Sequence, residues 1–330
     1  MKRVTIYDVA KEADVSLATV SRVINGAEVV KSVTRKKVED AIEKLGYKPN
    51  AIAQGLALQK TTTIGLILPE TSFTYTGQVI NGILDVAKIY KFKVNLHTMT
   101  DGINDITTVV NEVIKSRVDG VIVYNDSIVG DGVLELSKYH IPIVLIGNAD
   151  TDSDVCSVYV DIKKATYELV KSYLEKGVDD ISILQDKRNE YSIEQACLGA
   201  KKAFNEFNKE FTNFVKIPSE YRSTYKFTKE YLKENKPALF IANRDSQAMA
   251  LINSAKENGI DVPTDMEVVC IIDTKYNSMV RPEISSFSIP SYDLGAVSMR
   301  VMTKLLFEEE IVDKHKKLSY IYTARKSTKK

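Results

Sequence analysis

The stretch TIYDVAKEADVSLATVSRVIN, residues 5–25, has the pattern of two short helices joined by a tight turn. Thr5 is a good N-cap for the first helix, whose apolar side chains recur at helical spacing. The pattern breaks at Asp14, and Ser16 can cap a second helix that ends before Gly26. The sequence therefore predicts a helix-turn-helix at the start of the chain.

The two faces of the second predicted helix differ in character. Val20, Val23 and Ile24 lie three or four residues apart and can pack together against the first helix. The opposite face has short or polar side chains and one arginine, which suits close approach to base edges in a major groove. Its residues are Ser16, Leu17, Ala18, Ser21 and Arg22. A helical hairpin that only packs is the alternative, and the polar uncovered face favours DNA binding.

The charge distribution supports this interpretation. The chain has 330 residues and a formal net charge of +1. Residues 1–60 contain 11 Lys and Arg against 7 Asp and Glu, whereas the remaining residues contain 34 against 37. Positive charge is thus concentrated where phosphate neutralisation would need it.

Cysteine content and hydropathy limit the compartment. Cys156, Cys197 and Cys270 are widely spaced and form no CxxC pair, which predicts reduced thiols in a cytoplasmic protein. The first residues, MKRVTIYDVAKEA, lack the apolar segment of a secretory signal. No apolar run approaches the roughly 18 residues that a membrane span needs, so we expect no membrane partner.

No catalytic or metal-binding set is evident. His97, His140 and His315 are far apart and lack metal-ligand spacing, and no glycine-rich phosphate motif or nucleophile elbow occurs. We therefore expect no enzyme activity, no cofactor and no metal. A ligand-binding module without DNA function is a further alternative, which the helix-turn-helix and the missing signal disfavour.

Two more helices are predicted before the sequence changes character. Thr34 can cap a third helix that Gly46 ends. Residues 50–58, NAIAQGLAL, have helix-forming residues but include Gly55, which costs about 1 kcal/mol relative to alanine. Because nine residues are too few for a stable isolated helix, this segment should fold only when paired or bound.

From residue 63 onward, short β-branched runs alternate with amphipathic stretches. This alternation predicts doubly wound parallel sheets, and its length predicts two similar subdomains with a cleft at the carboxyl ends of their strands. The predicted strands are 63–68, 92–97, 120–124, 141–146, 158–160, 181–185, 238–242, 268–272 and 286–289. The predicted helices are 76–90, 105–116, 131–139, 162–176, 192–208, 224–235, 245–258 and 292–308.

Several segments resemble the lac repressor family of bacterial transcription regulators. They are TIYDVAKEADVSLATVSRVING, NAIAQGLA and KTTTIGLILPE, and the segments MVRPEISS and YDLGAVSMRVMTKLL are similar to the family's catabolite-control branch. The resemblance implies an α/β fold, with an N-terminal helix-turn-helix headpiece and a periplasmic-binding-protein-like core of two doubly wound parallel-sheet subdomains. The implied domains are a headpiece at 1–49, a hinge helix and linker at 50–60, and a regulatory and dimerisation core at 61–330. Within the core, the N-subdomain would comprise about 61–159 and 291–319, and the C-subdomain about 160–290 and 320–330.

The resemblance also implies a function, namely sequence-specific binding of a homodimer to a pseudo-palindromic double-stranded operator, with repression in carbon catabolite control. The residues Ser16, Leu17, Ala18, Ser21 and Arg22 would lie in the major groove. Those at or near phosphates would be Thr5, Tyr7, Thr19, Asn25 and Thr34. The hinge would contribute Asn50, Ala53 and Leu56, with Leu56 wedged into the minor groove at a cost of a few kcal/mol of unstacking.

The effector cleft departs from the sugar-binding pattern of the family. Ala196 and Ile272 stand where sugar-binding members have Arg and Asp, and Arg244, Gln247 and Ala250 are further departures. Only Asp245 and Asp273 are retained. Because each unpaired buried polar group costs about 1–3 kcal/mol, a hydroxyl-rich ligand would lack its partners here. We therefore expect no high-affinity free-sugar inducer.

The catabolite-control branch responds instead to a protein corepressor, the serine-phosphorylated phosphocarrier protein HPr. The positions that match its docking surface are Asp85, Tyr90, Tyr292, Asp293, Ala296, Arg300 and Lys304. The last four recur at three or four residues and are expected to share one helix face, where Arg300 and Lys304 could take a phosphoserine. The alternatives are an ordinary charged surface, or a constitutive or small-molecule-regulated repressor.

Overall fold

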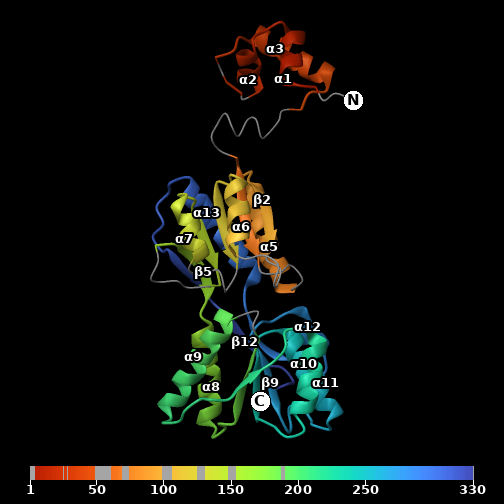
Figure 1. Ribbon diagram of the computed structural model, residues 1–330, viewed down its shortest axis with the longest axis vertical. Helices are drawn as coiled ribbons and strands as arrows, with labels where there is room; N and C mark the ends of the chain where they lie inside the picture. Colours follow the sequence, from red (N-terminus) through yellow and green to blue (C-terminus); the bar gives the residue numbers. More distant parts are fainter. Residues whose placement is uncertain are drawn as a thin grey trace. The chain divides into compact units, whose positions relative to one another are not determined.

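The structure is a computed structural model that describes residues 4–24, 26–27, 29–48, 61–68, 74–98, 106–124, 131–147, 154–186 and 190–329 (Figure 1). It divides into two compact units, residues 1–62 and residues 63–330. Each unit is described by itself.

The first unit contains a three-helix headpiece. Its helices are α1 (Ile6–Ala13), α2 (Leu17–Ile24) and α3 (Ser32–Leu45). Each helix contributes at least one fully buried side chain. The small core consists of Val9, Ala13, Val20, Val23, Val38 and Ala41. The apolar stripes predicted from the sequence therefore meet in one core.

The helix ends follow the local chemistry of the sequence. The Asp8 carboxylate accepts hydrogen bonds from the backbone N–H of Thr5 at 2.8 Å and from its hydroxyl at 2.7 Å. Gly46 ends α3 in the left-handed region at φ 62°, as predicted. The expected cap at Thr34 is wrong, because α3 begins at Ser32 and its first turn is closed by the Lys31 carbonyl, which accepts from the N–H of Arg35 at 2.9 Å.

The second unit contains two six-stranded sheets. Sheet A has the strand order β11-β5-β4-β3-β1-β2, and all of its neighbouring pairs are parallel. The strands are β1 (Thr63–Leu68), β2 (Lys93–Thr98), β3 (Gly120–Tyr124), β4 (Ile143–Ile146), β5 (Cys156–Val160) and β11 (His315–Leu318).

Helices cover both faces of sheet A. The helices are α5 (Thr74–Ile89), α6 (Ile106–Lys115), α7 (Asp131–Lys138) and α13 (Ser291–Leu306). Side chains of α5 and α13 share a core with Ile64, Leu66 and Ile122, whereas those of α6 and α7 pack with Ile67 and Val121 on the other face. The helices α5 and α13 touch closely, because a Cβ at Gly82 would collide with the Tyr292 carbonyl.

Sheet B has the strand order β12-β10-β9-β8-β6-β7, with β12 antiparallel to β10 and the other pairs parallel. The strands are β6 (Ile181–Gln185), β7 (Phe214–Lys216), β8 (Leu239–Ala242), β9 (Glu267–Cys270), β10 (Ser285–Ser288) and β12 (Ile321–Thr323). Its helices are α8 (Ile162–Glu175), α9 (Glu190–Glu206), α10 (Tyr221–Tyr231), α11 (Asp245–Glu257) and the short α12 (Lys275–Met279).

The helices of sheet B also form two layers. The helices α8 and α9 share one core with Ile181 and Ile241, and α10 and α11 share another with Leu184 and Phe240. Figure 1 shows the first pair in green on one side of the sheet and the second pair in cyan on the other. The predicted α/β architecture of a helix-turn-helix headpiece and two doubly wound sheets is confirmed.

Both sheets have the same internal order. Numbered from its own first strand, each sheet runs 2-1-3-4-5-6, and the order reverses between β1 and β3 in sheet A and between β6 and β8 in sheet B. In doubly wound sheets, ligands bind beyond the carboxyl ends of the strands at such a reversal. The reversal in sheet B therefore marks the place to look for an effector.

Candidate DNA-binding face, ligand edge and partner surface

The helix α2 is held by its apolar side. Val20 and Val23 are buried in the headpiece core. The N–H of Thr19 donates to the Ser16 hydroxyl oxygen at 3.2 Å, which caps the helix as predicted. The rotation of α2 about its axis is thereby fixed by packing at one side and by a cap at its first turn.

The opposite side of α2 is available for contact. Leu17 is 38% exposed, Ser16, Ala18 and Arg22 are exposed, and Ser21 is half-buried. One cation and several short side chains thus form a surface that can approach base edges without steric obstruction.

The expected phosphate contacts lie at different depths. Tyr7 is 69% exposed and Thr5 is exposed, whereas Thr19 and Thr34 are half-buried. Arg35 is used internally, because its guanidinium donates to the Ala27 carbonyl at 2.7 Å. The expected contacts at Asn25, Asn50, Ala53 and Leu56, together with the predicted hinge helix, lie outside the described residues.

The carboxyl edge of sheet B is filled by a buried ion pair. Asp186 follows β6 and Arg244 follows β8, so the pair lies at the reversal of strand order. The Arg244 guanidinium contacts the Asp186 carboxylate, and their side chains are 2% and 0% exposed. Two neutral groups also donate to the carboxylate: the Ser219 hydroxyl at 2.5 Å and the Gln247 amide at 3.0 Å.

Gln247 also ties this pair to the start of α11. Its amide oxygen accepts from the backbone N–H groups of Asn243 at 3.1 Å and Arg244 at 3.2 Å. The buried side-chain amide of Asn243 has no hydrogen-bond partner among the described residues. Arg244 and Gln247 were identified from the sequence as departures from the sugar-binding pattern of the family. Asp186 was not identified, because its pairing with Arg244 depends on the fold.

The two retained carboxylates of the expected effector cleft are also engaged. The Asp273 carboxylate lies 2.8 Å from the Arg325 guanidinium and accepts from the Ser286 hydroxyl at 2.8 Å. The Asp245 carboxylate accepts from the Thr274 hydroxyl at 2.6 Å and from the N–H of Ser246 at 2.6 Å. Both carboxylates therefore already accept hydrogen bonds from internal donors.

Apolar side chains occupy the other positions at which the sequence departs from the sugar-binding pattern. Ala196 and Ala250 are fully buried, and Ile272 is half-buried. Cys270, at the end of β9, is fully buried, and burial raises the pKa of its thiol. Apart from the Asn243 amide, the polar side chains named at this edge of sheet B are engaged in internal hydrogen bonds or ion pairs.

The expected corepressor surface lies along the exposed sides of α5 and α13. The Tyr292 hydroxyl donates to the Asp85 carboxylate at 2.9 Å and joins the two helices, and this hydrogen bond raises the pKa of Tyr292. Asp293, Arg300 and Lys304 are exposed, and Tyr90 is 44% exposed. The expectation for Ala296 is corrected: it is 3% exposed, because it packs against α5 where the helices cross.

No metal centre emerges from the described part of the chain. His97 lies on β2, where burial lowers its pKa, and His315 lies on β11 with Nδ1 at 3.0 Å from the Ser157 hydroxyl. Within the described ranges, no group of three His, Cys, Asp or Glu side chains could hold a metal ion. Among the described helices, none is long and apolar enough to cross a membrane.

Comparison with known proteins identifies the class. The profile of bacterial regulatory proteins of the lacI family matches residues 5–50, and that of a periplasmic binding protein-like domain matches residues 170–328. The lac repressor dimer bound to operator and the anti-inducer ONPF has the same fold, with a TM-score of 0.84, 24% identity and 99% of each chain covered. Together with relatives that are about 35% identical over nearly the whole chain, these matches show that the chain belongs to the lacI family and is a DNA-binding transcription regulator.

Relatives of one kind recur among the matches. Catabolite control protein A of Priestia megaterium is 35% identical over 330 residues, 99% of each chain, and that of Staphylococcus epidermidis is 36% identical over 313 residues, 93% of this chain and 94% of the relative. The transcription regulator CcpA of Lactococcus lactis has a TM-score of 0.72 and 26% identity, covering 81% of this chain and 99% of that one. The chain is thus similar to catabolite control proteins along its whole length.

Proposed function

We propose that the chain is a repressor in carbon catabolite control that binds a pseudo-palindromic operator as a homodimer in the cytoplasm. The observation that supports DNA reading is the exposed, short-chain face of α2 above the buried Val20 and Val23. One short helix contacts too few base pairs for high specificity, so two copies must act together. The proposed domains are a headpiece at 1–49, a hinge at 50–60 and a two-subdomain core at 61–330.

The proposed division of DNA contacts follows the exposure of the side chains. Base edges would be met by Ser16, Leu17, Ala18, Ser21 and Arg22, and phosphates by Thr5, Tyr7, Thr19, Asn25 and Thr34. Asn50, Ala53 and Leu56 would act from the hinge. Since Leu17 and Ala18 cannot form side-chain hydrogen bonds, part of the specificity would come from apolar contact and DNA shape.

Regulation is proposed to come from serine-phosphorylated HPr at the α5–α13 surface. Asp85, Tyr90, Tyr292 and Asp293 would contact the protein. Arg300 and Lys304 are exposed and form no ion pair within the described residues, so both cations are available for a phosphate. Arginine can bind a phosphate through two parallel hydrogen bonds, which adds geometric selectivity.

A constitutive repressor is the second candidate. It is favoured by the filled ligand edge of sheet B, where Asp186 and Arg244 satisfy one another. Under this alternative, the core would serve dimerisation only, and DNA binding would not change with phosphorylated HPr.

Selection of bound DNA from a random pool, with and without phosphorylated HPr, tests both candidates. The proposal predicts enrichment of a two-fold symmetric site, with tighter binding when phosphorylated HPr is present and no effect of unphosphorylated HPr. Equal enrichment under all conditions would support the constitutive alternative. A site without two-fold symmetry would contradict the dimer.

An Arg22→Ala variant checks the assignment of α2. Loss of a base contact should cost about 1–3 kcal/mol on the selected site and relax the preference at one position in each half-site. Lys31→Ala is a matched control, because Lys31 is exposed in the same headpiece but lies outside α2. If the two variants weaken all sequences alike, Arg22 contacts phosphate rather than bases.

A further inference from the structure

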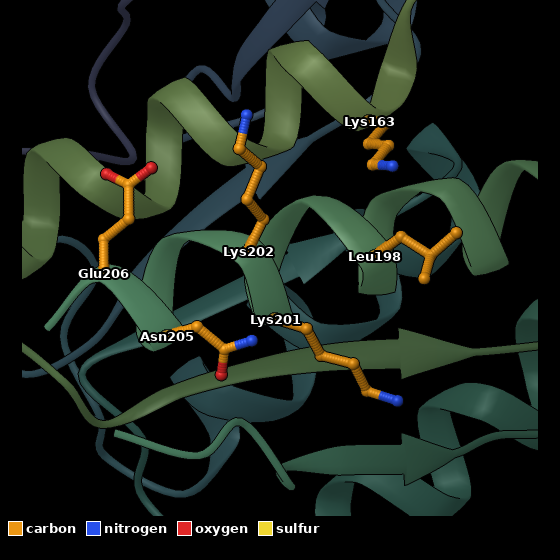
Figure 2. Close-up of a pocket in the computed structure, with 6 residues that line it drawn as sticks. All are labelled: Lys163, Leu198, Lys201, Lys202, Asn205 and Glu206. Carbon is orange, nitrogen blue, oxygen red and sulfur yellow. The ribbon is translucent and has the colours of Figure 1, made fainter. Parts of the chain in front are cut away.

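A shallow groove runs between α8 and α9 on the outer side of sheet B. Its volume is about 570 Å³, and it is lined by Lys163, Leu198, Lys201, Lys202, Asn205 and Glu206. Figure 2 shows Lys163 projecting from α8 toward α9 and Lys202 projecting from α9 toward α8. The two helices pack closely at Gly199, where a Cβ would collide with the Lys163 carbonyl.

The groove carries a net positive charge, with three lysines and one glutamate in its lining. Lys163, Lys201 and Lys202 form no ion pair within the described residues, and the Lys202 ammonium lies 4.5 Å from the centroid of the Tyr167 ring. The acidic residue of the groove, Glu206, is already bound: it accepts from Lys171 at 2.9 Å and from the Tyr167 hydroxyl at 2.9 Å. These hydrogen bonds lower the pKa of Glu206.

The shape of the groove suits a polypeptide segment rather than a small molecule. Leu198, Lys202 and Asn205 are three or four residues apart on α9, so they follow one side of the helix for roughly 10 Å. Small-molecule pockets usually enclose most of the ligand surface, whereas this groove is largely open to solvent. An apolar side chain, Leu198 at 37% exposure, is flanked by lysines, as in a protein interface with an apolar centre and a charged rim.

The same chain presents a complementary segment. The loop FEEEIVD, residues 307–313, follows α13 and precedes β11. Val312 is 93% exposed and Phe307 is 51% exposed. Glu308, Glu309 and Glu310 are exposed and form no ion pair within the described residues. The loop thus combines three free carboxylates with two exposed apolar side chains.

We propose that the α8–α9 groove binds the 307–313 loop of a second copy of this chain. The carboxylates of the loop would meet Lys163, Lys201 and Lys202, and Val312 would pack on Leu198. Because the two surfaces differ, the contact is heterologous and can join successive copies into assemblies larger than a two-fold dimer. A nucleic acid would match the lysines but not the exposed Leu198, so the acidic loop is the better match.

Paired charge reversals test this proposal on the full chain without DNA. One variant is K201E/K202E, with an acidic groove and an acidic loop, and the other is E308K/E309K/E310K, with a basic groove and a basic loop. Sedimentation velocity at low salt should show concentration-dependent assemblies beyond the dimer for the natural chain. Each variant alone should self-associate about tenfold more weakly, and an equimolar mixture of the two should associate again. Circular dichroism of each variant confirms that it is folded.

The control is K236E/K326E, which makes the same change in charge at exposed lysines outside the groove. It should associate like the natural chain and lose association only as salt screens the charges. The proposal is overturned if the natural chain never exceeds a dimer, if the mixture fails to associate, or if the control is as weak as K201E/K202E. It is likewise overturned if only the groove variant loses association, since another acidic partner, such as a nucleic acid contaminant, would then occupy the groove.

Discussion

The carboxyl edge of sheet B and the outer face of α5 and α13 differ in whether their charged side chains are buried and paired or exposed and unpaired. At the sheet edge, Asp186 and Arg244 are removed from water and satisfy each other. On the helix face, Arg300 and Lys304 are exposed and without ion pairs in the described part of the chain. Most polar groups of the first region are engaged internally, apart from the Asn243 amide, which has no partner among the described residues, whereas the two cations of the second region are available to a partner.

This difference indicates where a signal can enter the core. A ligand gains binding free energy only from groups that are not already better satisfied without it. At the reversal of strand order in sheet B, a sugar would have to displace a buried ion pair. On the helix face, a phosphorylated protein would displace only water.

The largest effect is expected from breaking the buried pair. Arg244→Ala leaves the Asp186 carboxylate buried without its charge partner, so the free energy of unfolding should fall by about 3–5 kcal/mol. Urea denaturation followed by circular dichroism measures this change. The double variant D186L/R244M is the control, because replacing both partners with apolar side chains should restore most of the stability. A loss below about 1 kcal/mol in Arg244→Ala would mean that the pair is hydrated and the edge is open.

The next effect concerns the helix face. Arg300→Glu should weaken binding of serine-phosphorylated HPr by about 10- to 100-fold, because a hydrogen-bonded cation is replaced by a like charge. Surface plasmon resonance with phosphorylated and unphosphorylated HPr measures it. Lys236→Glu makes the same change in charge elsewhere in the core and should bind normally. If both variants bind phosphorylated HPr like the natural chain, the phosphate site lies elsewhere.

A smaller effect is expected at the hydrogen bond between α5 and α13. Tyr292→Phe removes an exposed contact to Asp85, so the melting temperature should fall by about 1 °C or less. This hydrogen bond raises the pKa of Tyr292, so its stabilisation is complete below the ordinary tyrosine pKa of about 10 and is lost as pH rises through the raised value. Thermal melts of both proteins should therefore converge at strongly alkaline pH. A difference that grows with pH would contradict this account.

No binding is expected when sugars or purines are added to the core. Calorimetric titration of the core with neutral hexoses, pentoses and purines should detect no micromolar binding, since Asp245 and Asp273 are engaged by internal donors. Heat of binding with a dissociation constant in the micromolar range would show that the sheet edge rearranges to admit a ligand, and would remove the contrast with the helix face.

Local patterns in the sequence were sufficient for most of the fold. Strands β1, β3 and β6 occupy the predicted residues, because each is a short run rich in β-branched residues and bounded by polar residues or proline. Strands β7, β11 and β12 were not predicted. Strand β11, with the sequence HKKL, is an edge strand whose pairing with β5 is decided by tertiary contact rather than by its own composition.

Site features that depend on neighbouring residues in the sequence could be predicted, and those that depend on the tertiary fold could not. The exposed face of α2 follows from helical spacing alone. The burial of Ala296 does not, because the α5–α13 crossing depends on small residues more than 200 positions apart, Gly82 and Gly295. Asp186 and Ser219 could not be assigned to Arg244 from sequence, since the order of strands in sheet B brings the three together.

The last strands of the two sheets have a consequence for synthesis of the protein. Strand β11 pairs with β5 in sheet A, and two residues later the chain enters β12, which pairs with β10 in sheet B. Neither sheet can therefore acquire all of its strands until residues 315–323 have emerged from the ribosome. During translation, the headpiece has all of its helices early, whereas both subdomains wait for the same short segment and finish folding nearly together after a long-range search. A nascent chain would thus be able to fold its headpiece helices well before it could complete the two-sheet core.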